Sequence, residues 1–143
     1  MKRLHLALVV VAAGSLALWA QSNLPTGREL TVKTPSDFDW KPSTNLPPGA
    51  EYHLIREDPA TRGIQAVVRF PSGYSFGSHA CDADETIVVL KGKLAVKTGD
   101  VERVLEPGGY AAIPAGLEHE FTVKSWGSCW YLLTTAGPFK IRK

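Results

Sequence analysis

The chain has 143 residues, 44% of them hydrophobic, which is enough for one domain with a single core. It carries 16 Lys and Arg residues and 14 Asp and Glu residues, and the small basic excess lies in Lys2 and Arg3 at the N-terminus. The rest of the chain is balanced in charge, so composition excludes the basic excess that is typical of proteins that bind nucleic acid or anionic membranes.

Residues 1–20 have the pattern of a secretory signal peptide. Lys2 and Arg3 precede an apolar run that ends at Ala20 and is short for a membrane span, which needs about 20 residues. We expect cleavage after Ala20 or Ala17, and a periplasmic or secreted protein that has no contact with the membrane once the signal is removed. An uncleaved anchor is the alternative.

Residues 21–45 are predicted to form a proline-rich extended arm. Its prolines, with several Ser, Thr and Asn residues, disfavour both helix and central strand. Residues 30–33 could add one edge strand. Phe38 and Trp40, on alternate positions, could lay their rings against the domain, whereas a loose linker is the other interpretation.

Residues 46–143 are predicted to form one all-β domain. Short strand-like runs recur about every ten residues, and each ends at Gly, Pro or Asp. The runs cover residues 52–57, 63–70, 73–79, 85–90, 93–98, 102–106, 110–114, 118–124 and 128–135. No helical period competes with them, so the pattern predicts an antiparallel β-sandwich or barrel.

We expect the apolar residues of these runs to pack in the core rather than to line a pocket: Ile87, Val89, Leu94, Val96, Phe121, Tyr131 and Leu133. Trp126 and Trp130 are expected to pack near one end of the sandwich.

Potential metal ligands gather within residues 73–92. His79 and Cys81 lie two positions apart in a predicted strand, so their side chains point the same way and their Cα atoms are roughly 6 to 7 Å apart. A polar turn at 82–84 precedes Glu85, which opens an apolar strand that can bring its carboxylate back beside His79. The spacing therefore predicts that these three side chains can reach one ion.

A second patterned block follows at residues 108–121, GGYAAIPAGLEHEF. The two blocks together resemble the two motifs of the cupin superfamily. The first motif is matched by Gly73, His79, Glu85 and Gly92, and the second by Gly108, Pro114, Gly116 and His119. The run from His79 to Gly92 and the terminal Gly137-Pro138-Phe139 resemble, in particular, small bacterial single-domain cupins of unassigned function.

The resemblance implies an antiparallel jelly-roll β-barrel or sandwich with a metal held by His79, Glu85, His119 and, as a further candidate ligand, Cys81. It implies one divalent transition metal, with zinc or iron expected first and manganese, copper or nickel as alternatives. Cupins often dimerise, so a homodimer is possible. His5 and His53 have no partner at ligand spacing and are expected to be bystanders.

Two positions depart from the cupin motifs. Val123 replaces an asparagine outside the ligand set, and Cys81 replaces the second histidine of the first motif. Three interpretations of Cys81 stay open: a thiolate ligand that favours zinc, copper or iron, a disulfide with Cys129, or a free buried thiol. In the disulfide case the remaining two histidines and one carboxylate would suit iron(II) and oxygen chemistry.

The superfamily contains dioxygenases, isomerases, decarboxylases and non-catalytic binders, so the fold alone does not choose a reaction. We expect either a metal-dependent enzyme that acts on a small organic molecule or a module that only binds or senses such a molecule. Glu118 and Glu120 are weak candidates for acid or base work, because their side chains should face away from the side chain of His119.

Overall fold

The computed structural model describes residues 30–143, so the predicted signal peptide and the first part of the arm lie outside the described residues. One short 3-10 helix, η1 (Pro35–Asp37), precedes the strands. The strands within these residues are β1 (Lys41–Pro42), β2 (Glu51–Glu57), β3 (Ile64–Phe70), β4 (Ser75–Cys81), β5 (Glu85–Lys91), β6 (Leu94–Thr98), β7 (Val101–Leu105), β8 (Tyr110–Ile113), β9 (His119–Val123), β10 (Cys129–Thr135) and β11 (Ile141–Arg142). No helix in this part of the chain has the length and apolarity to cross a membrane.

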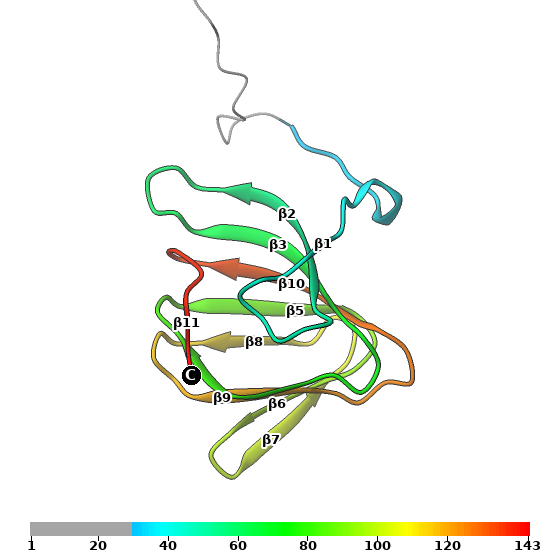
Figure 1. The fold of residues 1–143 in the computed structure, drawn as a ribbon, viewed down its shortest axis with the longest axis vertical. Coiled ribbons are helices and arrows are strands. Elements are labelled where there is room, and N and C mark those ends of the chain that lie inside the picture. The colour runs from blue at the N-terminus through cyan, green and yellow to red at the C-terminus, as the bar shows by residue number, and fades with distance from the viewer. Residues whose placement is uncertain (1–29) are drawn as a thin grey trace, which may run out of the picture.

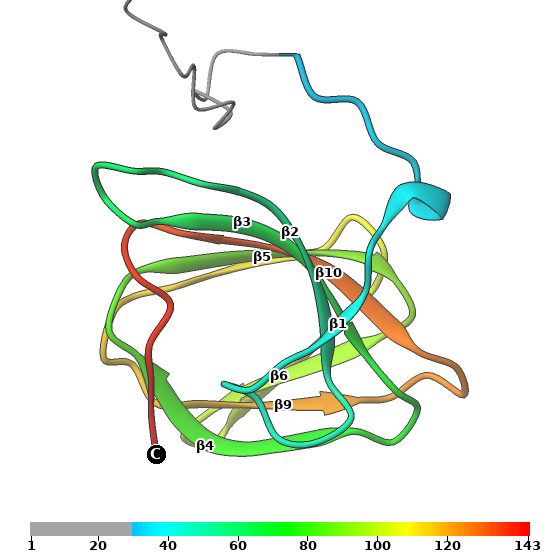
Figure 2. The ribbon, with the colours of Figure 1, turned by 45° about the horizontal axis from the view of Figure 1, so that its top comes forward.

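The strands form two antiparallel sheets that face each other (Figure 1). The six-stranded sheet has the order β1-β2-β3-β10-β5-β8, and the five-stranded sheet has the order β11-β4-β9-β6-β7. Figure 2 shows β4, β6 and β9 below the strands of the larger sheet. The all-β fold is therefore confirmed, and of the two predicted forms the structure is a sandwich.

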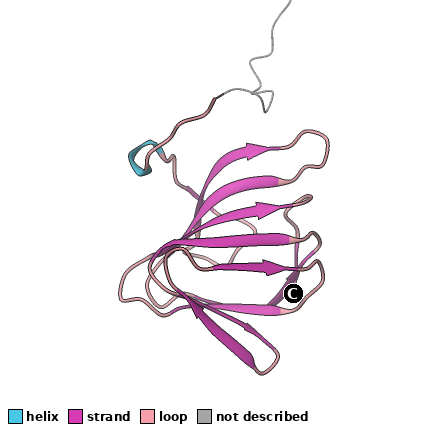
Figure 3. Cartoon of the chain, turned by 180° about the vertical axis from the view of Figure 1, so that it is seen from behind, coloured by secondary structure: helices cyan, strands magenta, loops and turns pink. Residues whose placement is uncertain are grey.

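All nine predicted strands are present, as β2 to β10. The two strands that the sequence did not indicate, β1 and β11, have two residues each. The strand expected at residues 30–33 is absent, and the edge strand of the arm is β1 instead. Leu30 and Val32 are exposed, so that stretch buries no apolar face against the sheet. Seen from behind, the arm leaves the sandwich as loop around the single helical turn (Figure 3).

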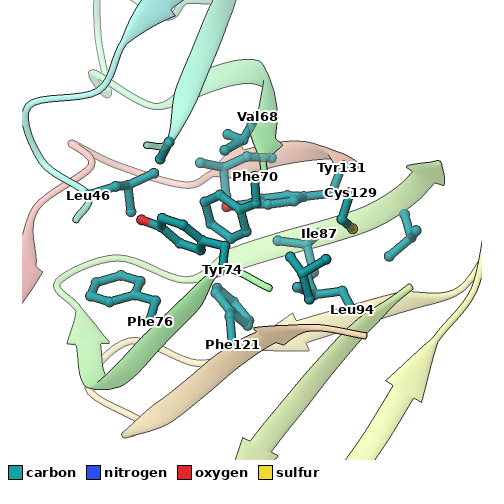
Figure 4. Close-up of a cluster of buried hydrophobic side chains, with 14 of the residues drawn as sticks. Leu46, Val68, Phe70, Tyr74, Phe76, Ile87, Leu94, Phe121, Cys129 and Tyr131 are labelled. Atoms are coloured by element: carbon teal, nitrogen blue, oxygen red, sulfur yellow. The ribbon is translucent and has the colours of Figure 1, made fainter. Parts of the chain in front are cut away.

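The core lies between the two sheets, and in β5, β9 and β10 it is built from alternate residues. Six of the seven predicted core residues are buried, and Val96 packs partly buried against them. Figure 4 shows Phe70 beside Tyr74 and Tyr131, and Leu46, which follows the arm, closing one side of this cluster. The ring of Phe70 is stacked on that of Tyr74 with 4.2 Å between centroids. Aromatic pairs of this kind add about 0.5 to 1.5 kcal/mol beyond the burial of their area.

The arm packs on the outer face of the six-stranded sheet through two aromatic residues. Phe38 stacks on His53 at 5.0 Å between ring centroids, and Trp40 meets Trp130 edge to face at 5.1 Å. The ring contacts predicted for Phe38 and Trp40 are therefore present. Trp126, in contrast, is fully exposed in the loop before β10, so the packing expected for it is wrong.

Gly92, the last residue of the first motif, occupies a turn that no other residue would fit well. Its φ is +79°, and a Cβ atom at this position would lie 2.8 Å from the carbonyl oxygen of Ser128. A side chain here would be strained by its backbone conformation and would also clash with the neighbouring loop.

Candidate functional site

The four predicted ligands come from both sheets and meet inside the sandwich. His79 and Cys81 lie on β4 and His119 opens β9, all in the five-stranded sheet, while Glu85 opens β5 of the other sheet. The turn at 82–84 carries the chain from one sheet to the other. All four side chains are buried.

The two histidines are direct cross-strand partners. His79 pairs with His119 in the register of β4 and β9, after an irregularity between Phe76 and His79 that shifts the register. Their ring centroids are 4.1 Å apart. The ring of Phe76 stacks almost flat on that of His79, with 3.6 Å between centroids, and so covers one face of the imidazole.

Backbone hydrogen bonds fix the loops around these side chains. Gly116, in the second motif, donates its N–H to the carbonyl of Cys81 at 2.8 Å. Asp82 donates its N–H to the carbonyl of Lys140 at 3.0 Å, and the carboxylate of Asp84 accepts the N–H of Ala115 at 2.8 Å. These bonds join both motifs and the C-terminal segment at the end of the sandwich that holds the four side chains.

Both imidazoles are oriented through Nδ1. Nδ1 of His79 lies 2.8 Å from the carbonyl of Gly77, and Nδ1 of His119 lies 2.9 Å from the carbonyl of Leu117. A carbonyl only accepts, so each Nδ1 carries the hydrogen, and in the neutral ring Nε2 is left with a free lone pair. Histidines that bind metals through Nε2 are held in this way.

Glu85 and His119 form the closest contact of the site. Oε1 of Glu85 lies 3.0 Å from Nε2 of His119, yet both atoms are buried without a hydrogen-bond partner. Two ligands bound to one zinc at about 2.0 to 2.2 Å lie roughly 3 to 3.5 Å apart. The separation of these two donor atoms therefore fits a shared metal ion, and the residues present fit the expected donor set.

The complete ligand set is not arranged around a common point, however. Within residues 30–143, no three His, Cys, Asp or Glu side chains form a group that could hold a metal ion as they stand. His79 packs its ring on Phe76, and Glu85 contacts His119 directly. The structure thus brings the four predicted residues to one place but does not arrange them as a ligand group around one point.

The two histidines differ in their response to the site. Burial lowers the pKa of His79 to about 4, and the neighbouring His119 contributes in the same direction. Burial also acts to lower the pKa of His119, but the carboxylate of Glu85 beside Nε2 and the carbonyl of Leu117 beside Nδ1 together raise it above the ordinary value. His79 is therefore the neutral imidazole of the pair, while Glu85 stabilises a proton on His119.

Cys81 and Cys129 are both free thiols, so the disulfide interpretation is wrong. Cys129 lies on β10 in the other sheet, opposite Phe70, whereas Cys81 lies opposite Ile141. Burial, followed by the charge and hydrogen bond of Glu85, raises the pKa of Cys81 to about 12. Its thiol must lose a proton to act as a ligand, which a metal ion can cause.

Other acids near the site face outward. The carboxylate of Glu118 accepts a hydrogen bond from the hydroxyl of Ser78, and Glu120 pairs with Lys97, both at the surface. Their orientation away from His119 was predicted. His53, dismissed as a bystander, is buried beneath Phe38, and its Nε2 has no hydrogen-bond partner. Phe38, which covers His53, lies on the arm, so no local sequence pattern around His53 could have indicated its burial.

A cavity of about 350 Å³ opens beside the site, and no sequence pattern indicated it. Its walls are residues 43–45 of the arm, the adjoining Leu46, the inner faces of β2 and β3, Leu133 of β10 and residues 138–140 before β11. Leu133 pairs with Ile87, two residues beyond Glu85 on the same face of β5. This diagonal relation puts the Cα atoms of Leu133 and Glu85 roughly 7 to 8 Å apart.

Comparison with solved structures finds the same fold in proteins of low sequence identity. The polyketide cyclase RemF from Streptomyces resistomycificus is 17% identical, with a TM-score of 0.67 over 80% of this chain and 85% of that one. KdgF from Halomonas sp. is 19% identical, with a TM-score of 0.62 over 76% and 94% of the two chains. A proposed acetylacetone dioxygenase from Methylibium petroleiphilum PM1 is 22% identical, with a TM-score of 0.65 over 80% and 82%.

A search of curated protein sequences finds no match. The family model for the ChrR cupin-like domain matches residues 28–140, which include all four candidate ligands and the packed part of the arm. The chain is therefore a cupin, and it belongs to the family of ChrR cupin-like domains.

Proposed function

We propose that the protein is exported and is a metal-dependent enzyme that acts on a small organic molecule. The observation that carries the proposal is the contact between Oε1 of Glu85 and Nε2 of His119, 3.0 Å apart, buried and without hydrogen bonds. When the His119 ring is neutral, Nε2 and the carboxylate oxygen are two acceptors that face each other in the interior, which is costly, and a cation between them would remove that cost.

His79, Glu85 and His119 would hold the metal, and Cys81 would add a thiolate. A soft sulfur donor together with imidazole and carboxylate favours zinc or iron over magnesium or calcium. When bound, the ion would supply polarisation of a carbonyl or enolate oxygen or, if it is iron(II), oxygen chemistry. The carbonyls of Gly77 and Leu117 hold the hydrogen of each neutral histidine ring on Nδ1, which leaves Nε2 available as a ligand atom.

A second candidate, a cupin that binds or senses a small molecule without turnover, is favoured by one observation. The two acids that flank His119, Glu118 and Glu120, are not among the candidate ligands and lie at the surface, away from the interior. Burial and the charge of Glu85 raise the pKa of Tyr131 well above its usual value, so its hydroxyl stays neutral. General acid or base work would then fall to the ligands themselves.

Metal content is the first test. The mature protein is purified from the periplasm, and bound metal is measured by mass spectrometry in the wild type, His119→Ala, Glu85→Ala and His53→Ala. His53 is a matched control because it is also buried but lies on the outer face of the sheet. We expect the two site variants to lose well over half of the metal and the control to keep it. Equal metal in all four proteins contradicts the assignment.

Turnover separates the enzyme from the binder. Oxygen uptake and product formation are followed with a panel of small carbonyl acids and phenols, using protein loaded with the metal that the first test identifies. Turnover that His119→Ala abolishes supports the enzyme. Stoichiometric binding without turnover supports the binding module.

A further inference from the structure

The cavity beside the site has an apolar floor. One side is lined by Ile64, Ala66 and Val68 of β3. Other sides are lined by Leu46, which follows the arm, and by Leu133 of β10. Val68 and Leu133 are core residues that are almost completely buried, so the cavity reaches the space between the sheets. Cavities of this size with mainly apolar walls and a few polar groups are typical of small-molecule sites.

The rim of the cavity carries two cations and one anion. Arg62 and Lys140 line it together with Glu57. Oε1 of Glu57 lies 2.7 Å from Nε of Arg62. A guanidinium carries five N–H donors, so Arg62 can bind a second anion as well. Lys140 has no ion-pair partner in the part of the chain that the structure describes. The neutral residues 43–45 of the arm complete the rim, which is therefore positive overall.

The backbone holds Arg62 in an unusual conformation. With φ of +62°, it is the only residue other than glycine in the left-handed region among residues 30–143. The turn is fixed by Asp58, which accepts N–H groups from Ala60 and Thr61 on its carboxylate and from Arg62 on its carbonyl. The next residue, Gly63, lies against β10 so closely that a Cβ atom would be 2.5 Å from the carbonyl oxygen of Thr135. Backbone strain that the surroundings impose in this way is often found at binding sites.

Lys140 connects the rim to the candidate metal site. Its carbonyl accepts the N–H of Asp82, and the following residue pairs with Cys81. A molecule held at the rim would thus extend inward past Leu133, which is close to Glu85 on the adjacent strand.

We propose that this cavity binds an amphipathic organic anion, with its carboxylate on Arg62 and Lys140 and its apolar body over the floor of β3 and Leu133. The inference rests on the proposed function in so far as it takes this anion as the molecule on which the metal site acts. Binding itself requires only the cavity, because none of the four candidate ligands lines it.

The experiment compares 4-phenylbutyrate with its neutral analogue 4-phenylbutan-1-ol by isothermal titration calorimetry. We expect the wild type to bind the acid about tenfold or more tightly than the alcohol, since hydrogen bonds to charged groups are the stronger ones. Arg62→Asn should remove this preference. Asn tolerates a positive φ, so this variant should fold at least as stably as the wild type. Glu57→Gln should tighten binding of the acid, because it removes a carboxylate that competes for Arg62.

Two further samples separate this proposal from the metal assignment. Arg103→Gln removes an exposed arginine from β7, at the other edge of the sandwich, and should leave both affinities unchanged. Wild-type protein treated with a chelator should still prefer the acid to the alcohol, because this preference depends on Arg62 and Lys140. Wild-type protein that binds both compounds equally, or fails to bind the acid, overturns the cavity proposal, as does an unchanged preference in Arg62→Asn. None of these results affects the metal measurement.

Discussion

The packing of the arm can be measured by removing one ring. In Trp40→Ala the arm loses one of its two aromatic contacts with the outer face of the six-stranded sheet. Trp40 meets Trp130 edge to face at 5.1 Å and Phe38 edge to face at 5.6 Å, and the guanidinium of Arg69 lies 4.2 Å from its centroid.

The size of the effect follows from these three contacts. Each aromatic pair contributes about 0.5 to 1.5 kcal/mol, and a cation over an exposed ring contributes about 0.5 to 1 kcal/mol. We therefore expect the free energy of unfolding to fall by about 1.5 to 4 kcal/mol.

Trp126→Ala is the matched control, because it makes the same chemical change at a side chain that is 101% exposed. Its cost should stay within about 0.5 kcal/mol, as for most surface substitutions. Urea unfolding followed by far-ultraviolet circular dichroism measures both variants, since tryptophan fluorescence would change with the substitution itself. Equal losses of stability in the two variants would refute the packing argument.

Three other predictions concern pH, thiols and the turn at Gly92. Burial holds the pKa of His79 at about 4 in the folded, metal-free protein. As pH falls below about 6.5, the unfolded chain therefore binds a proton at His79 before the folded chain does. The free energy of unfolding should fall by about 3 kcal/mol between pH 6.5 and 4. His119, whose pKa is raised, acts in the opposite direction, and in His79→Gln urea titrations across this range should show no such loss. Thiol titration of the unfolded, metal-free and non-reduced protein should find two free thiols, Cys81 and Cys129, whereas none would contradict the structure. Gly92→Ala should lower the free energy of unfolding by about 1 to 3 kcal/mol, as measured by urea titration, and an unchanged midpoint would show that the turn relaxes without cost.

The strands could be predicted because strand-like runs recur about every ten residues and end at Gly, Pro or Asp, and because alternate residues of β5, β9 and β10 are buried. Strands β1 and β11 could not, because two residues carry no period. The motif spacing correctly indicated which four side chains meet, since the turn at 82–84 and the loop before His119 bring strand ends together. It could not indicate that Phe76 would stack on His79, because that contact depends on the irregularity within β4.

The errors arise where sequence gives no information about which sheet a strand joins. The sequence leaves a disulfide between Cys81 and Cys129 open, but their strands belong to different sheets. Trp126 was expected to pack because it is large and apolar, but it lies at an exposed loop between Ser125 and Gly127. The cavity at Arg62 depends on a turn, an arm and the C-terminal segment, which meet only in the folded chain.

The arm touches the sandwich in two places with different roles. Trp40 rests on the outside of the larger sheet, and a few residues later Leu46 enters the inner side and forms part of the cavity wall. That wall is therefore made by a segment outside the main strands of either sheet. Substitutions at residues 43–45 can reshape the entrance without disturbing a single interior strand, so selection or protein engineering could change which molecules enter while His79, Cys81, Glu85 and His119 stay the same.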